Sequence, residues 1–222
     1  MKAKEKVVTI KECEEITKLH FTMNHTGKMS GMYSLSTSCT CNEFCKKRSQ
    51  NTGSVCSHCY AQRQMKMYKT LEKCLIRNTE ILTRQIIDEK DLPLINALYF
   101  RLEAFGDLNN ATQVINYFNL CKKNPEVKFA LWTKNLWLIE DVIKNGIKKP
   151  KNLNIVYSLH NLNEQNDKIF EWYPFVDKVF AVFDKKYIKE NGIKINCGAE
   201  NCLSCGKCYR KSKAKYINEK LK

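Results

Sequence analysis

The chain of 222 residues carries a formal net charge of +15 and contains 12 cysteines, and 43% of its residues are hydrophobic. This length allows one domain with a sizeable core, or one domain with a small addition. The longest apolar stretches are only as long as a strand, which excludes a helix that spans a bilayer. The lysine-rich start at 1–6 runs into Val7 and then acidic residues, so it is not a secretory signal. We therefore expect a cytoplasmic protein with no membrane partner, whose cysteines bind metal rather than form disulfides.

Most of the positive charge comes from lysine, with modest concentrations at 144–151 and 207–222. A basic surface attracts phosphate, which favours a nucleic-acid partner. A chain rich in Lys, Asn and Ile is also what an A·T-rich genome encodes, so the charge alone gives weak support. The sequence leaves nucleic acid open as a partner.

Strand and helix patterns alternate along the chain. In chain order they predict a strand over 32–37, one long or two short helices within 62–88, a strand over 98–103, a helix over 111–123, a strand over 128–133, a helix over 136–144, strands over 153–159 and 178–183, a short helix over 187–191 and a last strand over 193–196. The tail from Lys211 onward is predicted to be a charged helix or a frayed end.

This alternation predicts βαβ units and a parallel sheet. Six strands are too few for a closed eight-stranded barrel, and they suit a partial barrel or an open sheet. Functional side chains in such sheets gather on loops that follow the carboxyl ends of the strands. Glu103, Asp107 and Ser158 follow predicted strands, and cysteines follow the first and the last one. We therefore expect all of them at one rim of the sheet.

The first cysteine group has the spacing Cys45-x10-Cys56-x2-Cys59. Thiolates two residues apart can bind one soft metal ion or one iron–sulfur cluster. Three cysteine ligands would leave one iron of a 4Fe–4S cluster open for chemistry. Cys39 and Cys41 lie close enough in the chain to replace Cys45. Zinc, bound by Cys41 or Cys45 together with Cys56 and Cys59, is the alternative metal.

The second group offers four thiolates, with the spacing Cys197-x4-Cys202-x2-Cys205-x2-Cys208. This spacing is typical of ferredoxin-style ligation of a closed cluster, and a zinc knuckle is the alternative. The alternative function is that of a non-catalytic metal-binding module, with zinc or iron–sulfur, for which nucleic acid contacted through the lysines stays open as a partner. The remaining thiols lie in helical or amphipathic stretches and are expected to be ordinary core residues: Cys13, Cys74 and Cys121.

Two sets of phrases carry a resemblance to known families. Cys56–Ala61 resembles the end of the cluster loop of the radical S-adenosylmethionine superfamily, and Phe105–Asp107 lies where that superfamily contacts the cofactor's amino group. More narrowly, four phrases resemble the phage-encoded gene product eighty-eight family: Asn24–Met29, Ser34–Thr37, Asn42–Cys45 and Phe129–Asn135. The resemblance implies a partial (β/α)6 barrel over 1–196 with a cluster loop at 39–59, followed by a cysteine-rich extension with a basic tail at 197–222.

The resemblance also implies an activity, that of a radical S-adenosylmethionine enzyme of unknown substrate. Three cysteines would hold a 4Fe–4S cluster that cleaves S-adenosylmethionine to a 5′-deoxyadenosyl radical, with flavodoxin or ferredoxin as the reductant. The residues implied to contact the cofactor are Glu103, Gly106 and Asp107 at its amino group and Ser158 at its ribose. A second cluster would carry electrons or brace the last strand. A phage origin would place the protein in the host cytoplasm.

Overall fold

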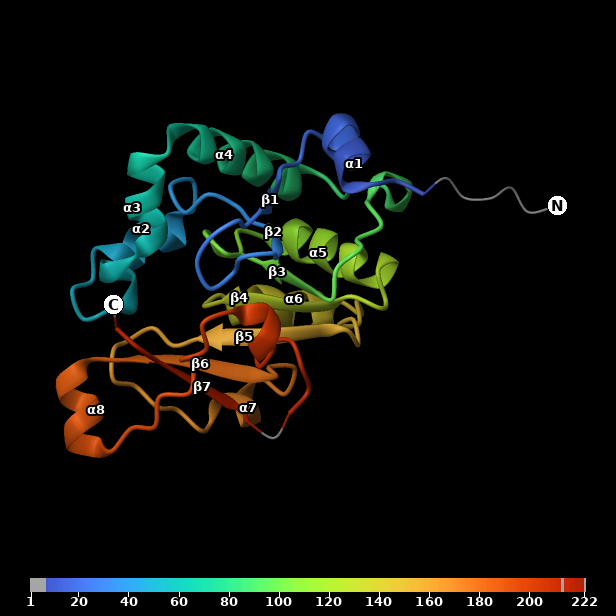
Figure 1. The fold of residues 1–222 in the computed structure, drawn as a ribbon. Coiled ribbons are helices and arrows are strands. Elements are labelled where there is room, and N and C mark those ends of the chain that lie inside the picture. The colour runs from blue at the N-terminus through green and yellow to red at the C-terminus, as the bar shows by residue number, and fades with distance from the viewer. Residues whose placement is uncertain (1–6, 213, 222) are drawn as a thin grey trace.

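The computed structural model describes residues 7–212 and 214–221 (Figure 1). Residues 1–6, where the sequence predicts no secretory signal, lie outside the described residues, as do 213 and 222 in the predicted tail. Across the described ranges, no helix combines the length and the apolar character needed to cross a membrane.

A sheet of seven strands forms the centre of the molecule. The strands lie across the sheet in chain order: β1 (Phe21–Met23), β2 (Tyr33–Leu35), β3 (Tyr99–Leu102), β4 (Lys128–Thr133), β5 (Leu153–Ser158), β6 (Lys178–Phe183) and β7 (Tyr216–Lys220). β1 is antiparallel to β2, and every later pair is parallel. The prediction of an α/β fold built on a parallel sheet is confirmed.

The prediction of a last strand over 193–196 is wrong, and β7 takes its place. Residues 193–197 run beside β7 without forming a strand, because the Asn196 side chain makes bonds that a strand backbone would make. Its Nδ2 donates to the Tyr216 carbonyl at 3.0 Å, and its Oδ1 accepts from the Asn218 amide at 2.9 Å. The tail from Lys211 is therefore neither a charged helix nor frayed over β7. The sheet also continues into the predicted extension at 197–222.

Helices connect most consecutive strands. The structure has α1 (Ile10–Thr17), α2 (Glu43–Ser49), α3 (Tyr60–Met67), α4 (Lys69–Arg84), α5 (Ala111–Lys123), α6 (Leu136–Lys144), α7 (Ile169–Trp172), α8 (Lys185–Asn191) and α9 (Cys202–Cys205), with short 3₁₀ helices η1 (Val55–His58) and η2 (Glu89–Asp91). The predicted helices over 111–123, 136–144 and 187–191 are confirmed, and the stretch 62–88 contains two helices, α3 and α4. The sequence patterns missed α1, α2, α7 and α9.

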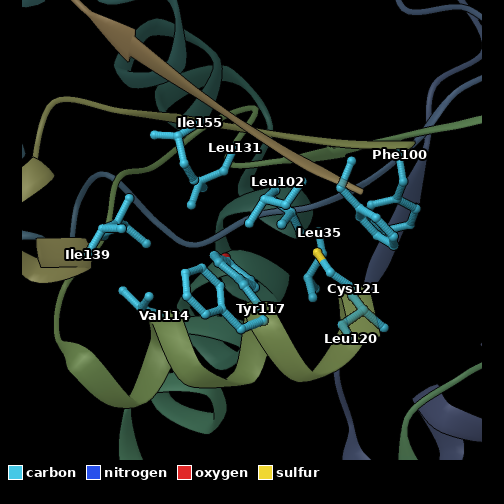
Figure 2. Close-up of a cluster of buried hydrophobic side chains, with 14 of the residues drawn as sticks. Leu35, Phe100, Leu102, Val114, Tyr117, Leu120, Cys121, Leu131, Ile139 and Ile155 are labelled. Carbon is cyan, nitrogen blue, oxygen red and sulfur yellow. The ribbon is translucent and has the colours of Figure 1, made fainter. Parts of the chain in front are cut away.

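One face of the sheet packs against the helices and forms the main core. Successive strand residues point to opposite faces, so Leu102 and its parallel neighbour Leu131 share this face. Figure 2 shows Val114 and Tyr117 of α5 pointing toward these strand residues. Full burial of a large apolar side chain contributes roughly 1.5–3 kcal/mol, so this layer supplies much of the driving force for folding.

The opposite face of the sheet is covered by the C-terminal cysteine segment instead of connecting helices. A second apolar cluster joins Tyr99, Ala130 and Val156 of the strands to Tyr209, with Cys202, Leu203 and Cys208 packed against it. Figure 1 shows the orange-red turn of α9 lying over the middle of the sheet. Strands in chain order, with the helices between them packed on one face, form a singly wound sheet, which is the arrangement of (β/α) barrels.

Candidate functional site

The loop that follows β2 carries the first cysteine group, and two capped helix starts position it. The Asn42 side chain accepts a hydrogen bond from the Cys45 amide at 3.2 Å and donates to the Asp107 carbonyl at 2.9 Å. The Ser54 hydroxyl accepts from the Cys56 amide at 3.1 Å and donates to the His160 carbonyl at 3.1 Å. Caps of this kind fix the first turn of a helix. They anchor Cys45 and Cys56 to loops at the carboxyl ends of β3 and β5.

Four thiols come together here, and we call Cys39, Cys45, Cys56 and Cys59 the rim cysteine group. Burial raises the pKa of Cys45, and its neighbours Asp107, Cys39, Cys56 and Cys59 raise it further. The sequence left open whether Cys39 or Cys41 replaces Cys45 as a ligand. Cys39 is 1% exposed and packs with Cys45 and Cys59 against Met65, whereas Cys41 points to solvent. The chain path therefore brings in Cys39 and leaves Cys41 out.

Lys134 follows a predicted strand and was expected at the rim of the sheet, but it was not among the residues predicted to bind metal or cofactor. Its ammonium donates to the Ser158 hydroxyl at 2.8 Å and to the Leu159 carbonyl at 2.5 Å. Burial lowers the pKa of Lys134, while the nearby Cys56, Asp107 and Cys45 oppose that shift. In the sequence, its position directly after the predicted strand over 128–133 indicated that it lies at the rim of the sheet. Lys134 thus brings a positive charge to the rim cysteine group and fixes the Ser158 hydroxyl by a hydrogen bond.

The Asp107 carboxylate ties the loops after β3 and β4 together. It accepts hydrogen bonds from the Thr133 hydroxyl at 2.5 Å, the Lys134 amide at 2.9 Å and the Leu108 amide at 2.8 Å. Burial raises the pKa of Asp107, and these hydrogen bonds counteract that effect. A buried carboxylate that is bonded so fully holds its loops firmly in place.

The Glu103 carboxylate faces the core rather than solvent. It is 2% exposed and accepts hydrogen bonds from the Thr37 amide at 3.2 Å, the Gln113 amide group at 2.6 Å and the Tyr117 hydroxyl at 2.5 Å. Its backbone has a φ of 56°, a left-handed conformation that is costly for residues other than glycine. These bonds hold Glu103 in that conformation and join β2, β3 and α5.

Glu103 gives the protein a pH-dependent stability. Burial raises the pKa of Glu103 to about 7, above the unfolded value of 4.5, although the hydrogen bonds oppose this shift. The folded state therefore holds this proton more tightly, and the stability it contributes is lost as the pH rises from about 4.5 to about 7. For this group alone the loss is about 3 kcal/mol.

Denaturant unfolding of wild type and Glu103→Gln at pH 5 and pH 7.5 should show that the free energy of unfolding falls more between the two pH values in wild type. Parallel losses in the two proteins would contradict this assignment.

Gly106 allows the loop after β3 to lie directly on the loop after β2. A Cβ at this position would stand 2.5 Å from the Thr37 hydroxyl oxygen and 2.6 Å from the Thr37 carbonyl oxygen.

We expect Gly106→Ala to lower the free energy of unfolding by about 1–3 kcal/mol through overpacking. Gly53→Ala is the matched control, because the nearest atom to its Cβ would be 3.6 Å away. Equal stability of the two variants in denaturant unfolding would refute the close approach at Gly106.

The second group (Cys197, Cys202, Cys205 and Cys208), here the C-terminal cysteine group, lies on the face of the sheet opposite the helices. The Asn154 side chain donates to the Cys208 carbonyl at 3.0 Å, and Asn154 is near the amino end of β5. The expectation that both groups share one rim is wrong, because this segment precedes β7 and folds back over the sheet.

Two cations accompany the C-terminal cysteine group. The Lys28 ammonium lies 3.0 Å from the Cys197 carbonyl, 3.8 Å from the Cys197 sulfur and 3.0 Å from Glu219. Burial raises the pKa of Cys208 to about 12, Arg101 opposes that shift, and the other three thiols of the group reinforce it. The four thiols therefore interact with one another, with Lys28 and Arg101 as nearby cations and Glu219 as a nearby carboxylate.

Arg101 on β3 lies beside the C-terminal cysteine group and was not selected from the sequence. Its guanidinium is 4.0 Å from the Trp132 ring centroid. Burial lowers the pKa of Arg101, but Tyr60, which follows Cys59 directly, Tyr209, Cys208 and Cys202 together raise it above its ordinary value. Within the described part of the chain, its buried Nε has no hydrogen-bond partner.

The thiols do not form a finished site for a single ion. Among residues 7–212 and 214–221, no three His, Cys, Asp or Glu side chains are arranged to hold one metal ion. The ligands of an iron–sulfur cluster bind different irons, so they stand further apart than the ligands of one zinc. All 12 cysteines are free thiols, and the expected core thiols Cys13 and Cys121 are buried, while Cys74 on α4 is half-buried.

The fold and these two thiol groups define a cysteine-rich α/β protein with a mostly parallel, singly wound sheet. The family described as Gene product 88 matches residues 3–218, so the chain belongs to that family. No curated protein and no solved structure matches the chain. The resemblance to gene product eighty-eight is confirmed, and the broader likeness to radical S-adenosylmethionine enzymes stays a prediction.

Proposed function

We propose that this protein is an iron–sulfur protein with a partial (β/α)6 barrel of the radical S-adenosylmethionine type. The observation that carries the proposal is the gathering of Cys45, Cys56 and Cys59 at the carboxyl ends of the parallel strands, where α/β enzymes hold their active sites. These three cysteines would hold a 4Fe–4S cluster with one open iron. When bound there with S-adenosylmethionine, the cluster supplies the electron for reductive cleavage of the sulfonium.

Cys39 is assigned as the thiol that does not bind this cluster. It is the fully buried member of the rim cysteine group and packs against Ala61, Met65 and Leu75, whereas the other three are partly exposed. Its side chain would pack behind the cluster without binding iron.

Glu103 and Asp107 would act on the cofactor by holding the loop between them. Their carboxylates bond inward, to Thr37 and Gln113 in one case and to Thr133 and the Lys134 amide in the other. The Ala104 amide donates to the Ser36 hydroxyl and its carbonyl accepts from the Tyr60 hydroxyl, so the backbone of Phe105 and Gly106 would meet the cofactor's amino group. Lys134 would hold the Ser158 hydroxyl for the ribose and balance the negative charge of the thiolates.

The C-terminal cysteine group would hold a second, closed cluster. Four thiolates on one cluster give it a net negative charge, which a setting of low dielectric tolerates only near cations. Lys28 and Arg101 are the cations that act on these thiols. The buried guanidinium of Arg101 supports this arrangement, because thiolates are the anions close to it.

Metal analysis of anaerobically purified protein tests the two-cluster assignment. We expect a brown protein with about eight irons, the number that two four-iron clusters need. Cys45→Ala and Cys202→Ala should each lose about half of the iron, because each removes a ligand of one cluster. The matched control is Cys41→Ala, which should keep all of it, because Cys41 is exposed and outside the rim cysteine group. A colourless protein that contains zinc, or loss of iron in Cys41→Ala but not in Cys45→Ala, would contradict the assignment.

Electron paramagnetic resonance tests the link to S-adenosylmethionine separately. The spectrum of the reduced wild type should change when S-adenosylmethionine is added, because the cofactor would bind the open iron. Cys202→Ala should keep this response, since it retains the rim cluster, and Cys45→Ala should lose it. If the protein holds its full iron content but its spectrum does not change with S-adenosylmethionine, it is an iron–sulfur protein without radical S-adenosylmethionine chemistry.

A further inference from the structure

A basic cleft opens at the end of the sheet opposite the rim cysteine group. It has a volume of about 430 Å³ and lies at the amino ends of β4 and β5. Its cationic side chains are Lys128, Lys151, Arg210 and Lys211, and its floor includes Asn154 and Tyr209. The cations therefore come from three stretches of chain that only the fold brings together.

The charge of this cleft is not balanced by nearby acids. All four cationic residues are exposed, and none forms an ion pair with another residue of the described ranges. Asp177 is an acid close by, in an adjoining hollow, and its carboxylate is occupied by the Lys149 ammonium at 2.5 Å and the Ile155 amide at 2.7 Å. The cleft therefore presents a concentrated positive field to solvent.

The wall formed by the C-terminal segment is held rigidly. The Tyr209 ring is 5% exposed and stacks on Tyr99 with the centroids 4.8 Å apart. The Arg210 Nε donates to the Tyr99 hydroxyl at 2.6 Å. Gly206 lets this segment approach the strand, because a Cβ there would stand 2.5 Å from that hydroxyl oxygen. The wall that carries Arg210 and Lys211 is thus fixed before any ligand arrives, which reduces the entropic cost of binding.

We propose that this cleft binds clustered phosphate groups, supplied by a nucleic-acid backbone or by a nucleoside triphosphate. Several lysines and an arginine at one concave site match an anion with several charges better than a single carboxylate. The half-buried Asn152 donates from its Nδ2 to the Cys121, Asn124 and Val127 carbonyls, so it ties the start of β5 to the end of α5 and the loop before β4. The proposal does not depend on which metal the cysteines bind.

The test uses the full chain and two double variants with the same change in charge. Lys128→Gln with Lys151→Gln removes two cations from the cleft. Lys185→Gln with Lys189→Gln is the matched control, because both lysines are exposed on α8, which follows the carboxyl end of β6. The probes are a fluorescein-labelled oligothymidylate, read by anisotropy at several salt concentrations, and ATP and inorganic triphosphate as competitors.

We expect the cleft variant to bind at least about tenfold more weakly than wild type, with a salt dependence lowered by about 1.4 in log–log slope. The control variant should match wild type. Direct binding of the oligothymidylate identifies nucleic acid as the source of phosphate, whereas binding of ATP alone, measured by calorimetry, identifies a nucleotide. Equal weakening in both double variants, or no binding of either probe to wild type, would overturn the proposal.

Discussion

The rim of the sheet depends on one buried carboxylate, that of Asp107. The carboxylate oxygens accept hydrogen bonds from the Thr133 hydroxyl and the Lys134 amide. The main-chain carbonyl of Asp107 accepts one from Asn42, which also caps the helix that carries Cys45. A buried carboxylate is costly unless it is bonded, so the loops after β2, β3 and β4 settle together around it. The positions of the rim thiols follow from this network more than from any property of the cysteines themselves.

The singly wound topology places the two cysteine groups and the basic cleft at different parts of the sheet. Because the connecting helices pack on one face of the sheet, the other face is free to receive the C-terminal cysteine segment. The rim cysteine group then lies at the carboxyl ends of the strands, and the basic cleft lies at their amino ends. Arg101 provides positive charge beside Cys202 and Cys208 of the C-terminal cysteine group and beside the phenols of Tyr60 and Tyr209.

The C-terminal segment links the C-terminal cysteine group to the basic cleft. Cys208 is followed directly by Tyr209, Arg210 and Lys211, which form one wall of the cleft. A ligand that binds in the cleft therefore touches the chain next to a proposed cluster ligand. Part of the high net charge of the chain thus has a defined location, which composition alone could not supply.

The sequence by itself determined the parallel sheet, since apolar runs such as those of β4 and β6 alternate with amphipathic helices, and it determined which cysteines have ligand spacing. It did not determine β7, whose lysine and asparagine mask the strand pattern, nor the Asn196 side chain that imitates a strand beside it. Only the tertiary structure decided between Cys39 and Cys41, because two residues of one loop differ only in which of them turns inward. The position of Lys134 after a predicted strand indicated the rim, but its contacts with Ser158 and Leu159 come from the fold, as does the placement of Arg101 beside the C-terminal thiols.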